Sequence, residues 1–168
     1  PPRLIITHGL SGSGKTWASG RWLRAEASGR AIRLRSDVER KRLYGVSPLA
    51  ASGSVVNAGL YRPQAHAETF ESLRLRARML LNEGWTVVVD AAFLRRSERQ
   101  AFAALARAAG CPFHLLVCEA PLHVLRQRIT ARQTAGDDAS DATLAVLEQQ
   151  LKWLEPLTPA ERACALPE

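Results

Sequence analysis

Residues 9–16, GLSGSGKT, have the composition and spacing of a loop that binds phosphate. Glycine tolerates positive φ, so Gly9, Gly12 and Gly14 allow backbone N–H groups to turn inward around an anion. The residues from Lys15 to about position 28 are expected to form a helix, whose N-terminus would add unpaired N–H groups and partial positive charge. A glycine-rich turn that merely precedes a helix is the alternative, and the match at every fixed position argues against it.

The side chains of this loop predict which parts of a nucleotide would be bound. Lys15 would reach the β- and γ-phosphates, and the Thr16 hydroxyl would be a Mg²⁺ ligand. ATP and Mg²⁺ are therefore the expected cofactors. The residues expected to bind ATP are Gly9, Leu10, Ser11, Gly12, Ser13, Gly14, Lys15 and Thr16.

The rest of the chain narrows the kind of phosphate chemistry. The chain contains no Asn-Lys-x-Asp, and no Asp-x-x-Gly follows a strand, which argues against a GTPase. Asp90 ends the run TVVVD and is followed by two alanines instead of a glutamate base, which argues against a motor ATPase. An adenylate-kinase-type loop would have glycine after Lys15, where this chain has threonine. A small kinase remains, in which positioning and electrostatics do most of the catalytic work.

Asp37 and Arg40 lie one helical turn apart, directly after the second expected strand. The carboxyl ends of strands line the ligand crevice of an open parallel sheet. A carboxylate there could orient an acceptor hydroxyl and take its proton, and an arginine could hold an anionic acceptor. The alternative is that Asp37 only stabilises the helix N-terminus while Arg40 lies on the surface.

Two further positions suit a kinase. Asp90 could position Mg²⁺, directly or through water, or bind the acceptor; its alternative is a turn or helix-cap aspartate. Arg128 and Arg132 share one face of an expected helix and could act as catalytic clamps on the transferring phosphoryl group. Their alternative is a solvated surface, which is where we expect Arg126.

The expected elements alternate between strands and helices, which predicts a three-layer α/β P-loop NTPase fold with a parallel sheet of four or five strands and helices on both faces. Strands are expected at 3–7, 31–35, 85–90 and 113–118. A long helix is expected at about 62–83, ending at Gly84, and another ends at Gly110. Ser36 and Ser97 are expected to begin capping boxes, and Ser140 to cap a later helix. We expect the tryptophans, Trp17 among them, in helix–sheet contacts.

The length, net charge and cysteine content of the chain limit the kinds of protein that it can be. The 168 residues suit a single domain. The net charge of +7 suggests nucleic acid as a possible partner. However, only three of the 23 basic residues are lysines and no block of five like charges occurs, so a nucleic-acid partner is not favoured. No apolar run is long enough for a membrane span, and we expect no signal peptide before the first strand. Three cysteines without metal-ligand spacing suit the cytoplasm.

Segments 45–60 and 133–140 are expected to be mobile acceptor-site and lid elements, with ordinary surface loops as the alternative. Tyr44, Tyr61, Arg62 and His66 could line a pocket, although core or surface positions are preferred for them. His8 is expected to have a packing role.

The chain resembles the P-loop kinase group that includes polynucleotide 5′-hydroxyl kinase, chloramphenicol phosphotransferase, gluconate kinase and zeta-type toxin kinases. It is most similar to bacterial predicted-kinase (AAA-type ATP-binding) modules that are fused to aminoglycoside-phosphotransferase-like domains. The resemblance runs nearly end to end, through LIITHGLSGSGKT, RSDVERKRLYG, VVVDAAFLRRSER, RQRITARQ and DASDAT.

The resemblance implies a role for each matching residue. Asp37 matches the general base, Arg40 the arginine that binds the acceptor phosphate, and Asp90 the second acidic residue. Arg128 and Arg132 match the lid arginines. Because Pro1 cannot be an initiator residue, we expect the chain to be either processed or, preferably, a piece of a longer protein. The resemblance implies that this longer protein carries a covalently fused second kinase-like domain.

The chain departs from this group in two respects. The group has a fifth parallel strand after the lid helix, and here either residues 163–166 are a stub of that strand or the strand is absent. Residues 45–66 match no single class of acceptor, so the hydroxyl acceptor stays unidentified.

Overall fold

The computed structural model describes residues 1–45, 63–135 and 143–167, and every structural statement below concerns these residues. The two predicted mobile segments fall mainly on residues 46–62 and 136–142, which lie outside the described residues, as do Tyr61, Arg62 and Ser140.

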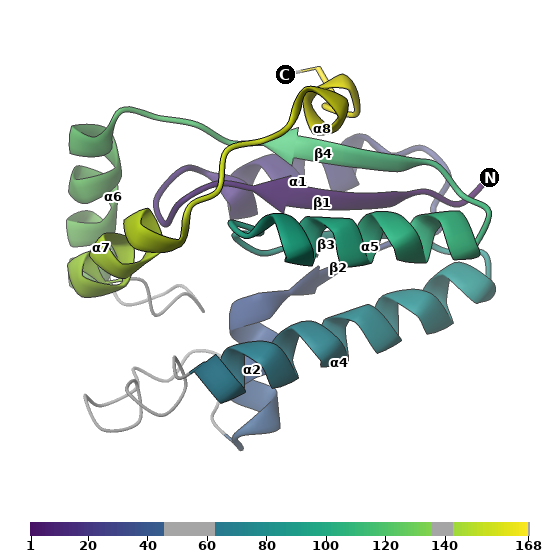
Figure 1. Ribbon diagram of the computed structural model, residues 1–168, viewed down its shortest axis with the longest axis horizontal. Helices are drawn as coiled ribbons and strands as arrows, with labels where there is room; N and C mark the ends of the chain where they lie inside the picture. Colours follow the sequence, from purple (N-terminus) through teal and green to yellow (C-terminus); the bar gives the residue numbers. More distant parts are fainter. Residues whose placement is uncertain (46–62, 136–142, 168) are drawn as a thin grey trace.

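A four-stranded parallel sheet forms the centre of the molecule, in the order β2-β3-β1-β4 (Figure 1). The prediction of a parallel α/β fold is confirmed, and each strand lies within one residue of its predicted position. The register aligns Arg35 with Asp90 and His8 with Val117, so the carboxyl ends of the strands meet at one edge. The strands are β1 (Leu4–His8), β2 (Ala31–Arg35), β3 (Thr86–Asp90) and β4 (Phe113–Val117).

Helices cover both faces of this sheet. In Figure 1, α4 and α5 lie in front of the strands and α1 lies behind them, while α6 and α7 stand at the edge to which the strand arrows point. The helices are α1 (Lys15–Ala25), α2 (Ser36–Leu43), α4 (Pro63–Asn82), α5 (Arg96–Ala108), α6 (Leu122–Ala135), α7 (Leu144–Trp153) and α8 (Pro159–Ala163).

The main core lies between the sheet and the α4–α5 layer. Alternate residues of β1 and β3 are β-branched or leucine and point to this layer, and α4 supplies a stripe at helical spacing. Gly84, at φ 82°, ends α4, and Gly110, at φ 66°, follows α5, so both predicted stops are confirmed. The stripe on α4 is Phe70, Leu73, Ala77 and Leu81.

The C-terminal segment extends the sheet beyond β4. Ala165 forms a parallel bridge with Leu115, held by hydrogen bonds from Leu115 N to Cys164 O at 3.0 Å and from Leu166 N to Leu115 O at 2.8 Å. Of the two alternatives for the fifth strand, the stub at residues 163–166 is therefore the one observed.

The predicted helix caps are wrong at three positions. Ser36 and Ser97 lie inside α2 and α5, whose N-cap positions are Arg35 and Arg95, and neither helix has a side-chain cap. The helix α7 begins at Leu144 and is capped by Thr143 instead of Ser140. The physical reason is clearest at α2, which begins directly after the last residue of β2 and leaves no turn in which a serine could cap.

Glu39, three residues after Ser36, would complete a capping box at α2, but its side chain is buried in other contacts. It accepts a hydrogen bond from Ser72 Oγ at 2.6 Å and forms ion pairs with Arg42 at 2.6 Å and Arg76 at 3.1 Å. Ser72 and Arg76 of α4 contact one oxygen of this carboxylate and Arg42 of α2 contacts both, so the group that a capping box would have used is engaged elsewhere.

No helix within the described residues is both long and apolar enough to cross a membrane.

Candidate active site

The loop at residues 9–14 joins β1 to α1, as the sequence predicts. Gly12 and Gly14 have φ of 82° and 92°, a region that L side chains rarely adopt. Gly14 is the N-cap of α1, and no side chain occupies the cap position. The first N–H groups of α1 have no intrahelical partners and face the loop, which is the arrangement that binds an anion.

Tertiary packing also demands glycine in this loop. A Cβ atom on Gly9 would lie 2.4 Å from the carbonyl oxygen of Cys118, and one on Gly12 would lie 2.9 Å from the carbonyl oxygen of Leu125 in α6. The residue after β4 and the helix α6 therefore pack so closely against the loop that only glycine fits at positions 9 and 12.

Lys15 extends across the loop, and its Nζ donates a hydrogen bond to the carbonyl oxygen of Leu10 at 3.0 Å. Burial lowers the pKa of Lys15, while the carboxylates of Asp90 and Asp37 act in the opposite direction. The ammonium therefore lies in a desolvated position, where a phosphate would be a strong partner.

Thr16 and Asp90 meet at the carboxyl edge of the sheet. Thr16 Oγ1 donates a hydrogen bond to Asp90 Oδ2 at 2.9 Å, and the Asp90 side chain is 5% exposed. Arg35 joins the pair: its Nη2 donates to Thr16 Oγ1 at 3.2 Å, and its Nε lies 3.3 Å from Asp90 Oδ2. No signal in the sequence indicated Arg35, because only the register of β2 against β3 places it beside Asp90.

The Thr16–Asp90 pair fits a magnesium ion that is bound together with a nucleotide. A hydroxyl and a carboxylate are hard oxygen donors, as Mg²⁺ requires. In the described parts of the chain, no three His, Cys, Asp or Glu side chains gather as a metal-binding group. Magnesium usually takes one or two carboxylates and completes its ligands with phosphate and water, so this donor set suits it.

Asp37 and Arg40 come together in the first turns of α2. Arg40 Nη1 donates to Asp37 Oδ1 at 3.1 Å, the Asp37 side chain is 26% exposed, and that of Arg40 is 7% exposed. Both residues line the same pocket as Lys15 and Thr16, at the carboxyl edge of the sheet. The alternative that places Arg40 on the surface is therefore wrong.

The far wall of this pocket is formed by α4, α5 and α7. His66 Nε2 lies 2.5 Å from Glu98 Oε1, and the His66 ring lies 6.2 Å from the ring of Trp153. The Arg95 guanidinium lies over Trp153 at 4.9 Å. The preference for a core or surface position of His66 is therefore wrong, since His66 lines the pocket.

Two contacts attach α6 and α7 to the phosphate-binding loop. Arg128 Nη1 donates to the carbonyl oxygen of Gly12 at 3.0 Å, and Ser11 N donates to Gln150 Oε1 at 2.8 Å. Arg132 lines the pocket with Lys15. The two arginines predicted to form a lid therefore lie at the loop, while no sequence signal indicated Gln150.

A second hollow lies on the other side of the loop, between α1, β4 and α6. Gly14 and Arg132 line both hollows, which therefore adjoin the loop at the same two residues. Trp17 and Trp22 line the second one. Trp17 is 64% exposed and stands beside Arg21 at 5.4 Å, so its expected helix–sheet contact is wrong.

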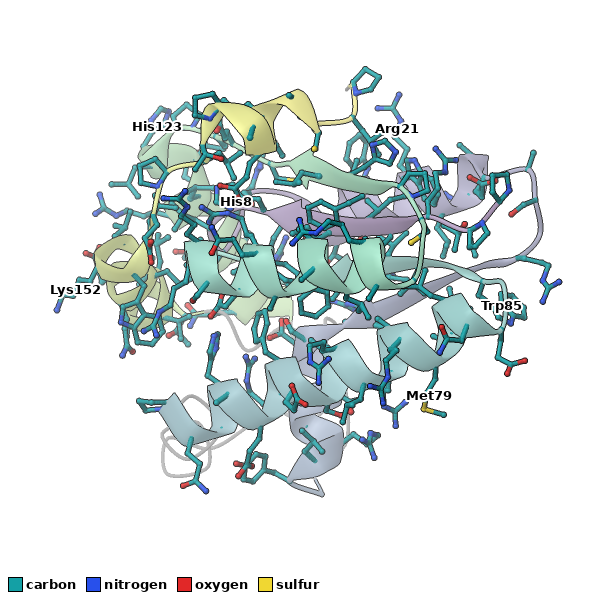
Figure 2. All side chains as sticks on the ribbon, turned by 45° about the vertical axis from the view of Figure 1, so that its right-hand side comes forward. His8, Arg21, Met79, Trp85, His123 and Lys152 are labelled. Carbon is teal, nitrogen blue, oxygen red and sulfur yellow. The ribbon has the colours of Figure 1, made fainter. Side chains whose placement is uncertain are left out.

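His8 has the expected packing role. At the carboxyl end of β1 its side chain is buried, and Nδ1 lies 2.9 Å from the carbonyl oxygen of Phe93 (Figure 2). This contact connects the strand before the phosphate-binding loop with the segment after Asp90.

Residues 4–157 match the family AAA_33, described as AAA domain. The chain belongs to this family. The matched region includes the loop, Asp37, Asp90, Arg128 and Arg132.

Relatives of this AAA domain occur in mycobacteria. An uncharacterized protein of Mycobacterium bovis is 29% identical over 156 residues, which are 90% of this chain and 30% of the relative. Two strains of Mycobacterium tuberculosis have counterparts with the same values. The chain therefore spans about 30% of the length of the curated relatives it matches.

Solved structures with the same fold include several kinases. A sugar kinase of a Janibacter species has a TM-score of 0.65 at 19% identity, over 99% of this chain and 84% of that one. A chain of the Pnkp1/Rnl/Hen1 RNA repair complex has a TM-score of 0.68 at 19% identity, over 91% and 44%. The Mycobacterium tuberculosis APS kinase in complex with AMPPNP and APS has a TM-score of 0.58 at 25% identity, over 85% and 78%. The AAA domain has the fold of P-loop kinases.

Proposed function

We propose that the AAA domain is an ATP-dependent kinase that transfers the γ-phosphoryl group to a hydroxyl of a small-molecule or nucleotide-type acceptor. One observation carries this proposal: a single pocket is lined both by Lys15 and Thr16 and by the Asp37–Arg40 pair. A phosphate-binding group and a candidate base for an acceptor thus face the same space, as transfer between two substrates requires.

The nucleotide would lie across the loop of residues 9–16. Backbone N–H groups at the start of α1 and the Lys15 ammonium would bind its phosphates, and the second hollow beside Trp17 would take its base. Thr16 and Asp90 would hold Mg²⁺, directly or through water. Bound there, Mg²⁺ would neutralise charge on the phosphates.

Asp37 would act as the general base in the transfer. Its carboxylate would take the hydroxyl proton of the acceptor as the acceptor oxygen bonds to the γ-phosphorus and the bond to the ADP oxygen breaks. The ion pair with Arg40 fixes the direction of the carboxylate, and Arg40 would also contact an anionic acceptor. Asp90 would additionally help to orient the acceptor.

Arg128 and Arg132 would stabilise the transferring phosphoryl group. Arg128 contacts the loop backbone at Gly12, and Arg132 lines both hollows. Cationic side chains in this position would bind the charge of the transition state more strongly than that of the ground state.

We also propose that the AAA domain works as one module of a longer cytoplasmic protein with a second kinase-like domain. Support comes from the length of the mycobacterial relatives, of which the chain spans 30%. The experiment for this part is isolation of the natural protein and mass spectrometry of its full length.

A screen of acceptors tests the kinase proposal. ADP formation from Mg·ATP is measured with sugars, sugar acids, nucleosides, nucleotides and a 5′-hydroxyl oligonucleotide, and phosphate transfer is followed with labelled ATP. The proposal expects at least one small acceptor to stimulate ADP formation and to become labelled. Labelling of the oligonucleotide alone would favour a nucleic-acid 5′-end kinase. ATP binding with no labelled acceptor, and an unchanged basal rate in Asp37→Asn, would favour a regulatory module that binds nucleotide.

A further inference from the structure

Arg35 is a cation in direct contact with both side chains that would hold Mg²⁺. Its Nη2 donates a hydrogen bond to Thr16 Oγ1 at 3.2 Å, and its Nε lies 3.3 Å from Asp90 Oδ2. The guanidinium and the metal would therefore use the same two groups.

The register of β2 against β3 brings Arg35 and Asp90 together. Arg35 and Asp90 are the last residues of β2 and β3 and are direct partners in the parallel register. Their side chains therefore leave the sheet on the same side and at the same edge. The side chains are 18% and 5% exposed, so the pair is largely protected from water and from screening by salt.

The Thr16 hydroxyl shows why the two cations compete. Its hydrogen goes to Asp90, so only its lone pairs are left for other partners. Arg35 donates to one of these lone pairs, whereas a metal ion would need them as ligands. Two cations beside one nearly buried carboxylate also repel each other more strongly than they would in water.

We propose that Arg35 competes with Mg²⁺ for the Thr16–Asp90 pair, and that metal binding displaces the guanidinium from this pair. In its place beside Thr16 and Asp90, Arg35 lines the same pocket as Lys15 and Arg132, so the phosphate chain of a bound ATP would lie within its reach. In the absence of metal, Arg35 therefore takes the place of the metal as counter-cation of the triphosphate, and it loses this role when Mg²⁺ binds. This inference rests on one part of the proposed function, the binding of ATP at residues 9–16.

The inference predicts two opposite effects of Arg35→Gln on nucleotide binding. Without metal, the dissociation constant of AMPPNP should rise about tenfold, because one charge-assisted hydrogen bond to the phosphates is lost. In Arg35→Gln, the Mg²⁺ concentration at which half of the chain is bound to both AMPPNP and Mg²⁺ should fall by about tenfold, because the competing cation is gone. A merely structural role of Arg35 would weaken binding in both conditions.

The experiment is isothermal titration calorimetry of the purified chain with AMPPNP, first in EDTA and then at a series of Mg²⁺ concentrations. The control is Arg30→Gln, which removes the same charge from an exposed arginine that bonds to the Glu83 carbonyl and lies over Trp85. The control should leave both binding constants unchanged. A thermal melt of each variant verifies folding.

Arg35→Lys keeps the inference testable if the Gln variant does not fold. Lysine keeps the charge, but a single ammonium group cannot contact Thr16 and Asp90 as the guanidinium does. Its Mg²⁺ midpoint should lie below that of the wild type. In whichever variant folds, a Mg²⁺ midpoint that is unchanged or higher than that of the wild type would overturn the proposed competition between Arg35 and Mg²⁺.

A wild-type chain that binds AMPPNP neither with nor without Mg²⁺ would overturn the nucleotide site and this inference together. Binding of AMPPNP without transfer to any acceptor would contradict only the kinase proposal.

Discussion

Arg128 Nη1 lies 3.0 Å from the carbonyl oxygen of Gly12, so a side chain of α6 is bonded to the backbone of the phosphate-binding loop. The two residues are 116 positions apart in the chain. A Cβ atom on Gly12 would also lie 2.9 Å from the Leu125 carbonyl oxygen in the same helix. The shape of the loop and the position of α6 therefore depend on each other, and the first prediction concerns this connection.

Arg128→Ala and Arg132→Ala should each lower turnover at saturating ATP more than they lower ATP affinity. The reason is that contacts to the transferring phosphoryl group strengthen in the transition state. Steady-state kinetics and calorimetry on the same preparations provide both numbers. Arg126→Ala is the matched control, because Arg126 lies on the same helix, is half-exposed and pairs with Glu148 at 3.0 Å. If ATP affinity falls while turnover at saturation holds, the proposed role in catalysis is wrong.

Lys15→Ala should abolish binding of Mg·ATP or catalysis and leave the fold intact. The Lys15 ammonium bonds to a loop carbonyl instead of packing in the core, so its loss removes a phosphate partner and little buried apolar area. Calorimetry with AMPPNP measures binding, and circular dichroism with a thermal melt measures the fold. Lys152→Ala, which changes an exposed lysine of α7, should behave as the wild type (Figure 2). Unchanged ATP affinity together with unchanged turnover would remove the nucleotide site.

Asp37→Asn should reduce phosphoryl transfer by about 10²–10⁴, the usual contribution of a positioned base. ATP affinity should change little, because the phosphates would bind on a different segment of the chain. The free energy of unfolding should fall by about 1 kcal/mol at most, since the side chain is partly exposed and the amide keeps its shape. ATP binding, acceptor phosphorylation and urea denaturation are measured side by side.

The control for Asp37 is Glu71→Gln, which removes a carboxylate from an exposed pair with Arg74 at 2.7 Å. It should leave transfer unchanged. Transfer by Asp37→Asn at the rate of the control would leave Asp37 with only a structural role at the start of α2. Arg40→Ala should in addition weaken the use of acceptors, and most of all of anionic ones.

His8 should make the fold less stable in mild acid. Burial lowers the pKa of His8 below its ordinary value of 6.5, although the hydrogen bond to the Phe93 carbonyl partly opposes this. Between pH 6.5 and the lower pKa of the folded state, His8 is protonated in the unfolded chain but stays neutral in the folded one. The free energy of unfolding therefore decreases as the pH falls from 6.5 toward the folded pKa. The loss is limited to about 1.4 kcal/mol per pH unit.

Urea denaturation at pH 7 and pH 5 measures this effect in the wild type and in His8→Asn, whose amide can still bond to the Phe93 carbonyl. The loss of stability between the two pH values should be smaller in His8→Asn. His123→Asn is the control, because His123 is exposed on α6 (Figure 2). The same pH dependence in the wild type and in His8→Asn would contradict the prediction.

Sequence alone determined the features that depend on neighbouring residues. The phosphate-binding loop follows from glycines that permit positive φ next to a lysine and a threonine, and the observed φ of Gly12 and Gly14 agree. Short runs rich in apolar residues, bounded by helix signals, predict the strands within one residue of their observed positions. The end of α4 at Gly84 is likewise a local event. The loop, the strands and the end of α4 can each be predicted from residues that lie within a few positions of each other in the chain.

Only the tertiary structure decided which distant side chains meet. Thr16 bonds to Asp90 across 74 positions, and Ser11 bonds to Gln150 across 139. Arg35 reaches Asp90 because of the register of two strands, and His66 reaches Glu98 because α4 and α5 pack on the same face of the sheet. The failed cap at Ser36 has the same origin, since the carboxylate of Glu39 bonds to Ser72 and Arg76 on α4. Register and helix packing are set by the burial of the whole core, so no short stretch of sequence carries enough information to predict these contacts.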